Sequence, residues 1–265
     1  MFLWLSWGDN AMRIWAVAIN TFKETIRNRV LLNILLFAVG LIVLSLVIGD
    51  WSLHQQVKVI KDFGLSAMSI FGLLIAIFIG IRLMAQELEQ KTIYIVASKP
   101  IHRWEIVLGK YFGLGMTLAI NVLLMSIALL GTNFLMEHRI DLGLTPAIFL
   151  IYLEILLIVG YALFFSSISS PTLSALFTLT IFVIGHLSST IRDYIQLYPD
   201  KGFHWLLKAI YYIAPNLENL NLKMNVVEHL DTPPHAVLYG FLYGVGYILI
   251  LLLLTMVIFE RKDLK

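Results

Sequence analysis

Glu154 is the clearest residue of this chain whose side chain could do chemistry in apolar surroundings. It lies in the run PAIFLIYLEILLIVGYALFF, in which almost every neighbour is apolar. A charge at the centre of a membrane-spanning helix costs about 2.5–3.5 kcal/mol on insertion scales. We therefore expect Glu154 to face protein or water, or to be protonated. Two roles remain open: a structural hydrogen bond to a neighbouring helix, or a place along a substrate path or at a seam between helices. Asn121 and Asn33 are similar positions with a smaller cost.

A metal site is not expected from the residue pattern. The chain has no cysteine, which excludes disulfides, thiolate metal sites and cysteine nucleophiles. Four possible ligands gather in one segment: Glu228, His229, Asp231 and His235. The Asp-Thr-Pro-Pro sequence among them prevents a shared helical face, and a zinc site requires three or four ligands in a fixed geometry. We expect this group to be polar surface.

No nucleotide-binding or hydrolytic motif is present in the sequence. The pair Gly109-Lys110 is followed by Tyr and lacks the upstream glycine of a phosphate-binding loop. No HExxH helix and no Ser–His–Asp set with a suitable loop context occurs. We therefore expect the chain to bind no cofactor and not to be an enzyme by itself.

The elements that carry these residues are long apolar segments. Hydrophobic residues make up 59% of the 265 residues and charged residues only 14%. A hydrocarbon core about 30 Å thick requires about 20 apolar residues of a helix, and lipid leaves no partner for free backbone groups. The sequence thus predicts an all-α polytopic membrane protein in one domain, residues 1–265. We expect six transmembrane helices at Val30–Ile48, Phe63–Ile81, Tyr111–Met136, Pro146–Phe165, Thr172–Thr190 and Ala236–Phe259.

The distribution of Lys and Arg predicts the orientation of the spans. If the N-terminus is cytoplasmic, twelve of the 19 Lys and Arg residues lie on the cytoplasmic side. An even number of spans then places the C-terminus on the same side. The first residues lack the basic start and the length of a signal peptide. Met12, which precedes Arg13, is an alternative start to Met1.

Three segments between the spans have patterns of their own. Residues Arg13–Arg29 place apolar side chains on one face and polar ones on the other, which predicts an interfacial amphipathic helix. Residues Gln86–Lys110 are the most charged segment and contain a Pro break, so they are either a solvated loop or a docking element. Residues 191–235 form the long outer segment, with a short interfacial helix expected at Phe203–Ile213. Two GxxxG patterns, Gly109–Gly113 and Gly240–Gly244, predict close helix packing.

Taken together, these features resemble the permease subunits of ABC-2 type transporters over nearly the whole chain. The resemblance lies in the order of the amphipathic N-terminal helix, the six spans and the charged segment with Lys91-Thr92 and Lys99-Pro100-Ile101-His102-Arg103. It extends to Ser167–Pro171, Ala214-Pro215-Asn216 and Phe259–Leu264. Within the family, the chain is most similar to the group of permeases for multicopper-enzyme maturation, which includes the one that serves nitrous-oxide reductase.

The resemblance implies a division of labour. A separate cytoplasmic ATPase subunit would bind ATP, and this permease would pair with a second copy or a paralogue in the lipid bilayer of the cell inner membrane. Glu87–Arg103 would be the coupling helix that docks on the ATPase. The coupling positions would be Glu87, Glu89, Lys91, Thr92, Lys99, Pro100 and Arg103. Residues Ser166–Pro171 would be a second, smaller contact.

An exporter subunit with no nucleic-acid partner is the function that this resemblance implies. Two other classes remain as alternatives. A membrane-embedded enzyme would need polar catalytic residues that meet at one depth, and the spans offer little beyond Glu154 and the asparagines. A self-powered secondary transporter would be expected to have inverted repeats and interrupted helices. Neither was found in the sequence.

Overall fold

The computed structural model describes residues 3–51, 55–90, 102–139, 141–197, 204–228, 230 and 234–261. Every regular element among these residues is a helix. The all-α polytopic fold expected from the sequence is confirmed. In chain order the helices are α1 (Leu3–Ile26), α2 (Arg29–Trp51), α3 (Gln56–Gln90), α4 (Arg103–Glu137), η2 (Leu142–Leu144), α5 (Thr145–Ile168), α6 (Pro171–His186), α7 (Ser188–Leu197), α8 (His204–Ile213), η3 (Leu217–Leu220), α9 (Lys223–Val227) and α10 (Pro234–Arg261).

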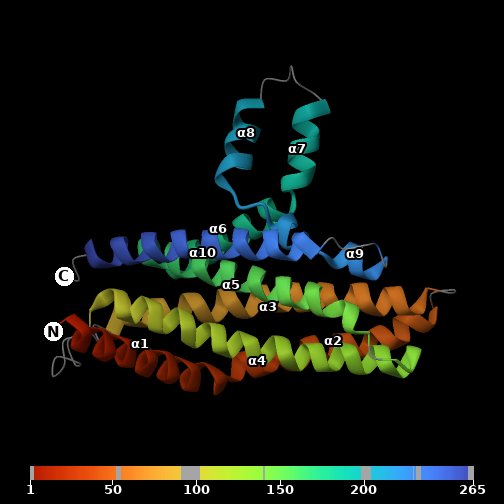
Figure 1. Cartoon of the computed structure of the whole chain (residues 1–265), viewed down its shortest axis with the longest axis horizontal. Coiled ribbons are helices and arrows are strands. Elements are labelled where there is room, and N and C mark those ends of the chain that lie inside the picture. Colours follow the sequence, from red (N-terminus) through yellow and green to blue (C-terminus); the bar gives the residue numbers. More distant parts are fainter. Residues whose placement is uncertain are drawn as a thin grey trace.

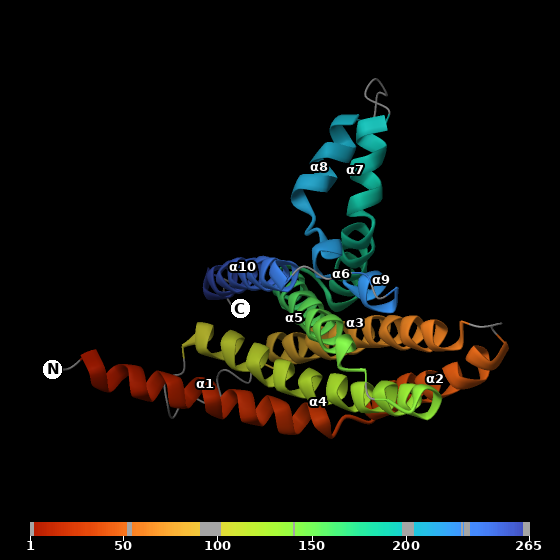
Figure 2. The same ribbon diagram turned by 45° about the vertical axis from the view of Figure 1, so that its right-hand side comes forward.

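The long helices form a bundle with α5 at its centre. Figure 1 shows α1 and α2 following one another along α4, with α3 and α5 between them and α10. Helix α5 packs against α3, α4, α6 and α10, and most of its side chains are buried. Helices α7 and α8 pair with each other and project away from the bundle (Figure 2).

The outer helices of the bundle expose apolar side chains, as helices that face lipid do. On α2, Leu36 and Phe37 are 69% and 62% exposed, and on α10 Leu242 and Leu253 are similarly exposed. Contact with water disfavours so many exposed apolar side chains, whereas contact with lipid tails does not. The apolar exterior therefore belongs in the bilayer.

Among the described residues, five helices are long and apolar enough to cross a membrane: α2, α3, α4, α5 and α10. The expected fifth span, Thr172–Thr190, is not one straight helix. Helix α6 ends at His186, and α7 leaves it at an angle of 55°. The break occurs where apolar residues give way to Ser188-Ser189-Thr190 and then to charged residues, which are poor helix formers or prefer water. Helix α6 with α7 is therefore a broken sixth span or a re-entrant segment.

The predicted start of a helix after Pro100 and the predicted turn before Pro171 are close to the helix boundaries observed. Helix α4 begins at Arg103, after the Lys99-Pro100 break, and Glu105 accepts a hydrogen bond from the His102 backbone N–H at 2.8 Å. Helices α5 and α6 are joined by a turn of two residues, and Pro171 begins α6, as proline suits the first turn of a helix. The amphipathic helix α1 starts at Leu3, well before the predicted Arg13.

Both GxxxG patterns serve contacts inside the chain. A Cβ atom added at Gly113 would lie 2.6 Å from the backbone oxygen of Ala18, and one at Gly109 would lie 2.6 Å from Val17. These glycines thus allow α1 to pack closely against α4. A Cβ atom added at Gly240 would lie 2.9 Å from the backbone oxygen of Asn219, and Gly244 similarly lies against Leu153 of α5.

We expect Gly113→Val to displace α1 from α4. The new side chain would meet backbone, which cannot turn away as a side chain can, so the loss should lie at the upper end of the about 1–3 kcal/mol typical of overpacking. The measurement is thermal unfolding of the purified protein in detergent. Gly131→Val on the same helix is the matched control, because nothing lies within 4 Å of its added Cβ. Equal melting temperatures of the two variants would contradict this account of the α1 contact.

Candidate functional site

One end of the bundle gathers the segments that the sequence assigns to the cytoplasm. We call it the coupling end: it holds the end of α3, the start of α4, the α5–α6 turn and the end of α10. The expected coupling residues Glu87 and Glu89 lie in the last turns of α3, where only the backbone is described. Lys91, Thr92, Lys99 and Pro100 lie outside the described residues. Arg103 is the first residue of α4.

Arg103 and Lys110 tie α4 to its neighbours at the coupling end. Arg103 donates from Nη1 to the backbone oxygens of Phe259 and Glu260, at 3.2 and 3.4 Å. Lys110 is 4% exposed and donates from Nζ to the backbone oxygen of Leu83 at 2.5 Å. The start of α4 is thus bonded to both α10 and α3. In the sequence, the only signal for this role of Lys110 is its charge at the start of an apolar span.

The buried carboxylate Glu105 is a further polar group that sequence reasoning did not single out. Its side chain is fully buried in the first turn of α4. One oxygen accepts from the His102 backbone N–H, and the other has no hydrogen-bond partner among the described residues. A carboxylate is favourable near a helix N-terminus because the backbone N–H groups there are partly positive. Glu105 thereby fixes the start of α4 next to the predicted coupling segment.

Glu154 lies in the centre of the bundle and faces protein, as expected. It is 1% exposed. The Ser69 hydroxyl of α3 lies 3.3 Å from its Oε1, and Nε2 of His186, in the last turn of α6, lies 3.3 Å from the same oxygen. Three helices therefore meet at this carboxylate, because Ser69, Glu154 and His186 belong to α3, α5 and α6.

The Glu154–His186 contact requires a proton. Nδ1 of His186 lies 3.2 Å from the backbone oxygen of Phe182, which can only accept a hydrogen bond, so Nδ1 carries a hydrogen. Nε2 faces the carboxylate, and either the imidazole or the carboxyl group must then supply the hydrogen between them. The pair can therefore store one proton at a buried position. The His186 side chain is 23% exposed.

Asn121 is buried but is not part of the same group. Its amide nitrogen donates to the backbone oxygen of Thr117 at 2.7 Å, and its side-chain oxygen has no partner among the described residues. No hydrogen bond within the described chain joins it to Glu154. Asn33 lies exposed on α2, so it does not face another part of the described chain.

A second buried ionic group lies at the opposite end of the bundle. Lys61 of α3 has a fully buried side chain, and its Nζ lies 2.7 Å from Asp141 Oδ2 and 3.5 Å from Glu137 Oε1. We call these three residues the outer clasp. Asp141 also accepts the backbone N–H of Gly143 at 2.9 Å, which starts η2. The clasp thus joins the start of α3 to the α4–α5 connection.

The four possible metal ligands of the outer segment do not form a described site. His229 and Asp231 lie outside the described residues, and no group of three possible ligands is found among the rest. Glu228 instead pairs with Lys58 at 2.9 Å, and both side chains are more than 40% exposed.

The long apolar helices of the described residues define a multi-pass membrane protein. The family described as ABC-2 family transporter protein matches residues 15–264. The chain belongs to this family, which is the family that the sequence features resemble. No curated protein matches the chain.

Proposed function

We propose that this chain is the membrane-spanning subunit of an ATP-driven exporter, and that a separate cytoplasmic ATPase subunit powers it. In this proposal the chain has no nucleotide site, catalytic site or cofactor of its own. It pairs with a second permease, either its own copy or a paralogue, in the cell inner membrane. Both termini lie in the cytoplasm, which places the coupling end on the side of the ATPase.

The observation that carries the proposal is the bonding at the coupling end. Lys110 joins α4 to the backbone of α3, and Arg103 joins it to the end of α10. A displacement applied to the segment between α3 and α4 would therefore reach three membrane helices together. Transmission between an ATPase and a membrane bundle needs rigid packed elements of this kind.

A proton-driven secondary transporter is the second candidate, and the Glu154–His186 pair is the observation that favours it. Ionisable residues inside a membrane often mark proton relays, and in this pair the imidazole and the carboxyl group face each other at 3.3 Å. The energy source distinguishes the two candidates. Transport into vesicles that follows an imposed pH gradient without ATP would favour the second.

We expect reversal of both charges in Glu87→Lys/Glu89→Lys to release the ATPase while the permease still inserts normally. Like charges placed at a complementary interface cost several kcal/mol and remove specific pairing. The measurement is co-purification of the two subunits from detergent, together with ATP turnover. The permease alone should show no specific ATP hydrolysis.

The matched control for this test is Asp193→Lys/Glu228→Lys. Both of its carboxylates are exposed, on α7 and next to α9, and their ion pairs are of the exposed kind that contributes little. Retention of the ATPase by the Glu87/Glu89 variant would remove these residues from the interface. Robust hydrolysis by the permease alone would contradict the division of labour.

A further inference from the structure

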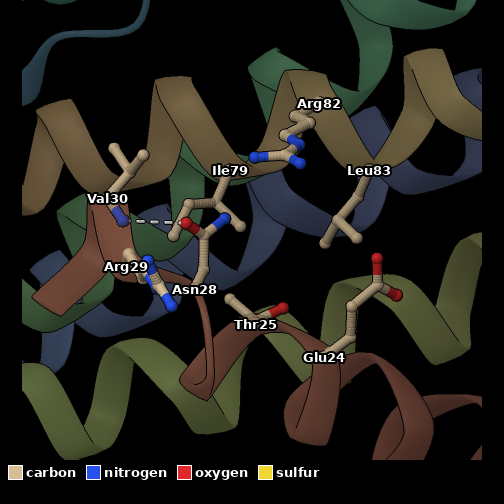
Figure 3. Close-up of a pocket in the computed structure, with 8 residues that line it drawn as sticks. All are labelled: Glu24, Thr25, Asn28, Arg29, Val30, Ile79, Arg82 and Leu83. Carbon is tan, nitrogen blue, oxygen red and sulfur yellow. Dashed lines mark hydrogen bonds between the residues drawn. The ribbon is translucent and has the colours of Figure 1, made fainter.

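A cavity of about 360 Å³ lies beside the turn between α1 and α2, and it is partly open. Figure 3 shows residues of α3 facing residues of the α1–α2 turn across it. The polar residues that line it are Glu24, Thr25, Asn28, Arg29 and Arg82, and the apolar ones are Val30, Ile79 and Leu83. Its volume falls within the range of about 300–1,000 Å³ typical of small-ligand pockets.

The charges of the cavity favour an anion. Arg29 and Arg82 enter it from two different helices, α2 and α3, against the single carboxylate of Glu24. Within the described part of the chain, no ion pair involves either arginine. Guanidinium groups offer planar pairs of N–H donors that match the oxygens of a phosphate. The side chain of Asn28 is already engaged, because its oxygen accepts the backbone N–H of Val30 at 2.9 Å.

The position of the cavity indicates that its ligand has an apolar part beside the anionic group. Arg29 is the first residue of the candidate membrane span of α2, and Arg82 lies two residues before the end of that of α3. Helix α1, which borders the cavity, is amphipathic. Val30 at the mouth is 45% exposed, and the apolar surface of α2 continues along the same face of the helix through the exposed Phe37 and Leu44. Such a boundary between basic and apolar residues is where lipid headgroups meet a membrane protein.

We propose that this cavity binds the phosphate-bearing headgroup of an anionic phospholipid. The phosphate lies between Arg29 and Arg82, and an acyl chain follows the exposed apolar side of α2. The bound lipid bridges α3 and the α1–α2 turn, and it therefore fixes the angle at which α1 meets the bundle. The inference is independent of the ATPase partner and of the transported substrate.

The test is native mass spectrometry of the purified full chain after titration with phosphatidylglycerol or phosphatidylcholine. We expect the unaltered chain to retain phosphatidylglycerol preferentially. Arg29→Gln/Arg82→Gln should weaken that retention by about tenfold or more, because two charged donors are removed. Val30→Trp, which fills the mouth of the cavity and keeps both charges, should also weaken it. Melting temperatures equal to that of the unaltered chain would show that the variants are folded.

Arg27→Gln is the matched control, since Arg27 carries the same charge two residues before Arg29 and does not line the cavity. An equal loss from Arg27→Gln would reduce the effect to general surface charge and overturn the site. Displacement of the lipid by millimolar inorganic phosphate or glycerol phosphate would assign the cavity to a soluble phosphate compound instead. Unchanged retention by the double variant would also overturn the proposal.

Discussion

Glu154→Leu should lower the stability of the bundle by about 3 kcal/mol, because it leaves buried polar groups without their hydrogen-bond partner. The leucine would leave His186 and Ser69 without their shared acceptor at the meeting point of α3, α5 and α6. Glu154→Gln should be nearly silent in the same unfolding measurement, because its amide keeps both the shape and the hydrogen bonds. Thermal and denaturant unfolding in detergent would measure the difference.

A double-mutant cycle measures the interaction energy between Glu154 and His186 separately from their contacts with other residues. If the Glu154–His186 contact stabilises the bundle, the double variant Glu154→Leu/His186→Leu should lose less stability than the two single variants lose in sum. The Gln variant then serves a second purpose in a transport assay. Full transport by Glu154→Gln would support a structural role, whereas loss of transport in a stable protein would show that the ionisable carboxyl is needed. Both roles would be contradicted if the losses of stability of the two single variants were fully additive and Glu154→Gln kept full transport.

Asp141→Asn should destabilise the outer end by about 3 kcal/mol or more, because it removes the nearer countercharge from the fully buried Lys61. This substitution removes the charge with little other change. Asparagine keeps an oxygen for the Gly143 backbone N–H, so the cap of η2 is preserved while the charge is lost. The measurement is again unfolding in detergent, with the slope of the denaturant curve used to check that the folded state is unchanged.

The control for this prediction is Asp193→Asn. Asp193 and its partner Arg192 are both more than half exposed, and such pairs contribute about 0–1 kcal/mol. A similar small loss at Asp141 would mean that Glu137, at 3.5 Å, is a sufficient countercharge for Lys61. Lys61→Met would then be expected to be as stable as the unaltered chain.

The bundle could be predicted from the sequence because its signals are local. An apolar run of sufficient length determines a membrane helix, and Ser169-Ser170-Pro171 between two such runs determines a turn. The restart of α4 after Pro100 follows from the same kind of reasoning. For the apolar runs, any structure other than a helix would leave backbone groups without partners in lipid.

The contacts between distant residues could not be predicted in this way. Ser69 and Glu154 are 85 positions apart, and Lys61 and Asp141 are 80 apart. No periodicity relates such pairs. The partner His186 could not be inferred either, because the sequence predicted a continuous span through it, whereas α6 ends there. The break places a helix terminus next to a buried carboxylate, and only the packing of α5 against α6 reveals this.

The length of α3 and α4 has a mechanical consequence. Each has 35 residues and is therefore about 52 Å long. Even a helix inclined by about 40° crosses a 30 Å hydrocarbon layer in about 39 Å, so each rod extends beyond it by at least about 13 Å. The outer clasp holds one end of the pair, and the Lys110 bond holds the two rods together near the other. If the pair tilts about the clasp, its displacement is largest at the opposite end, because that end is farthest from the clasp.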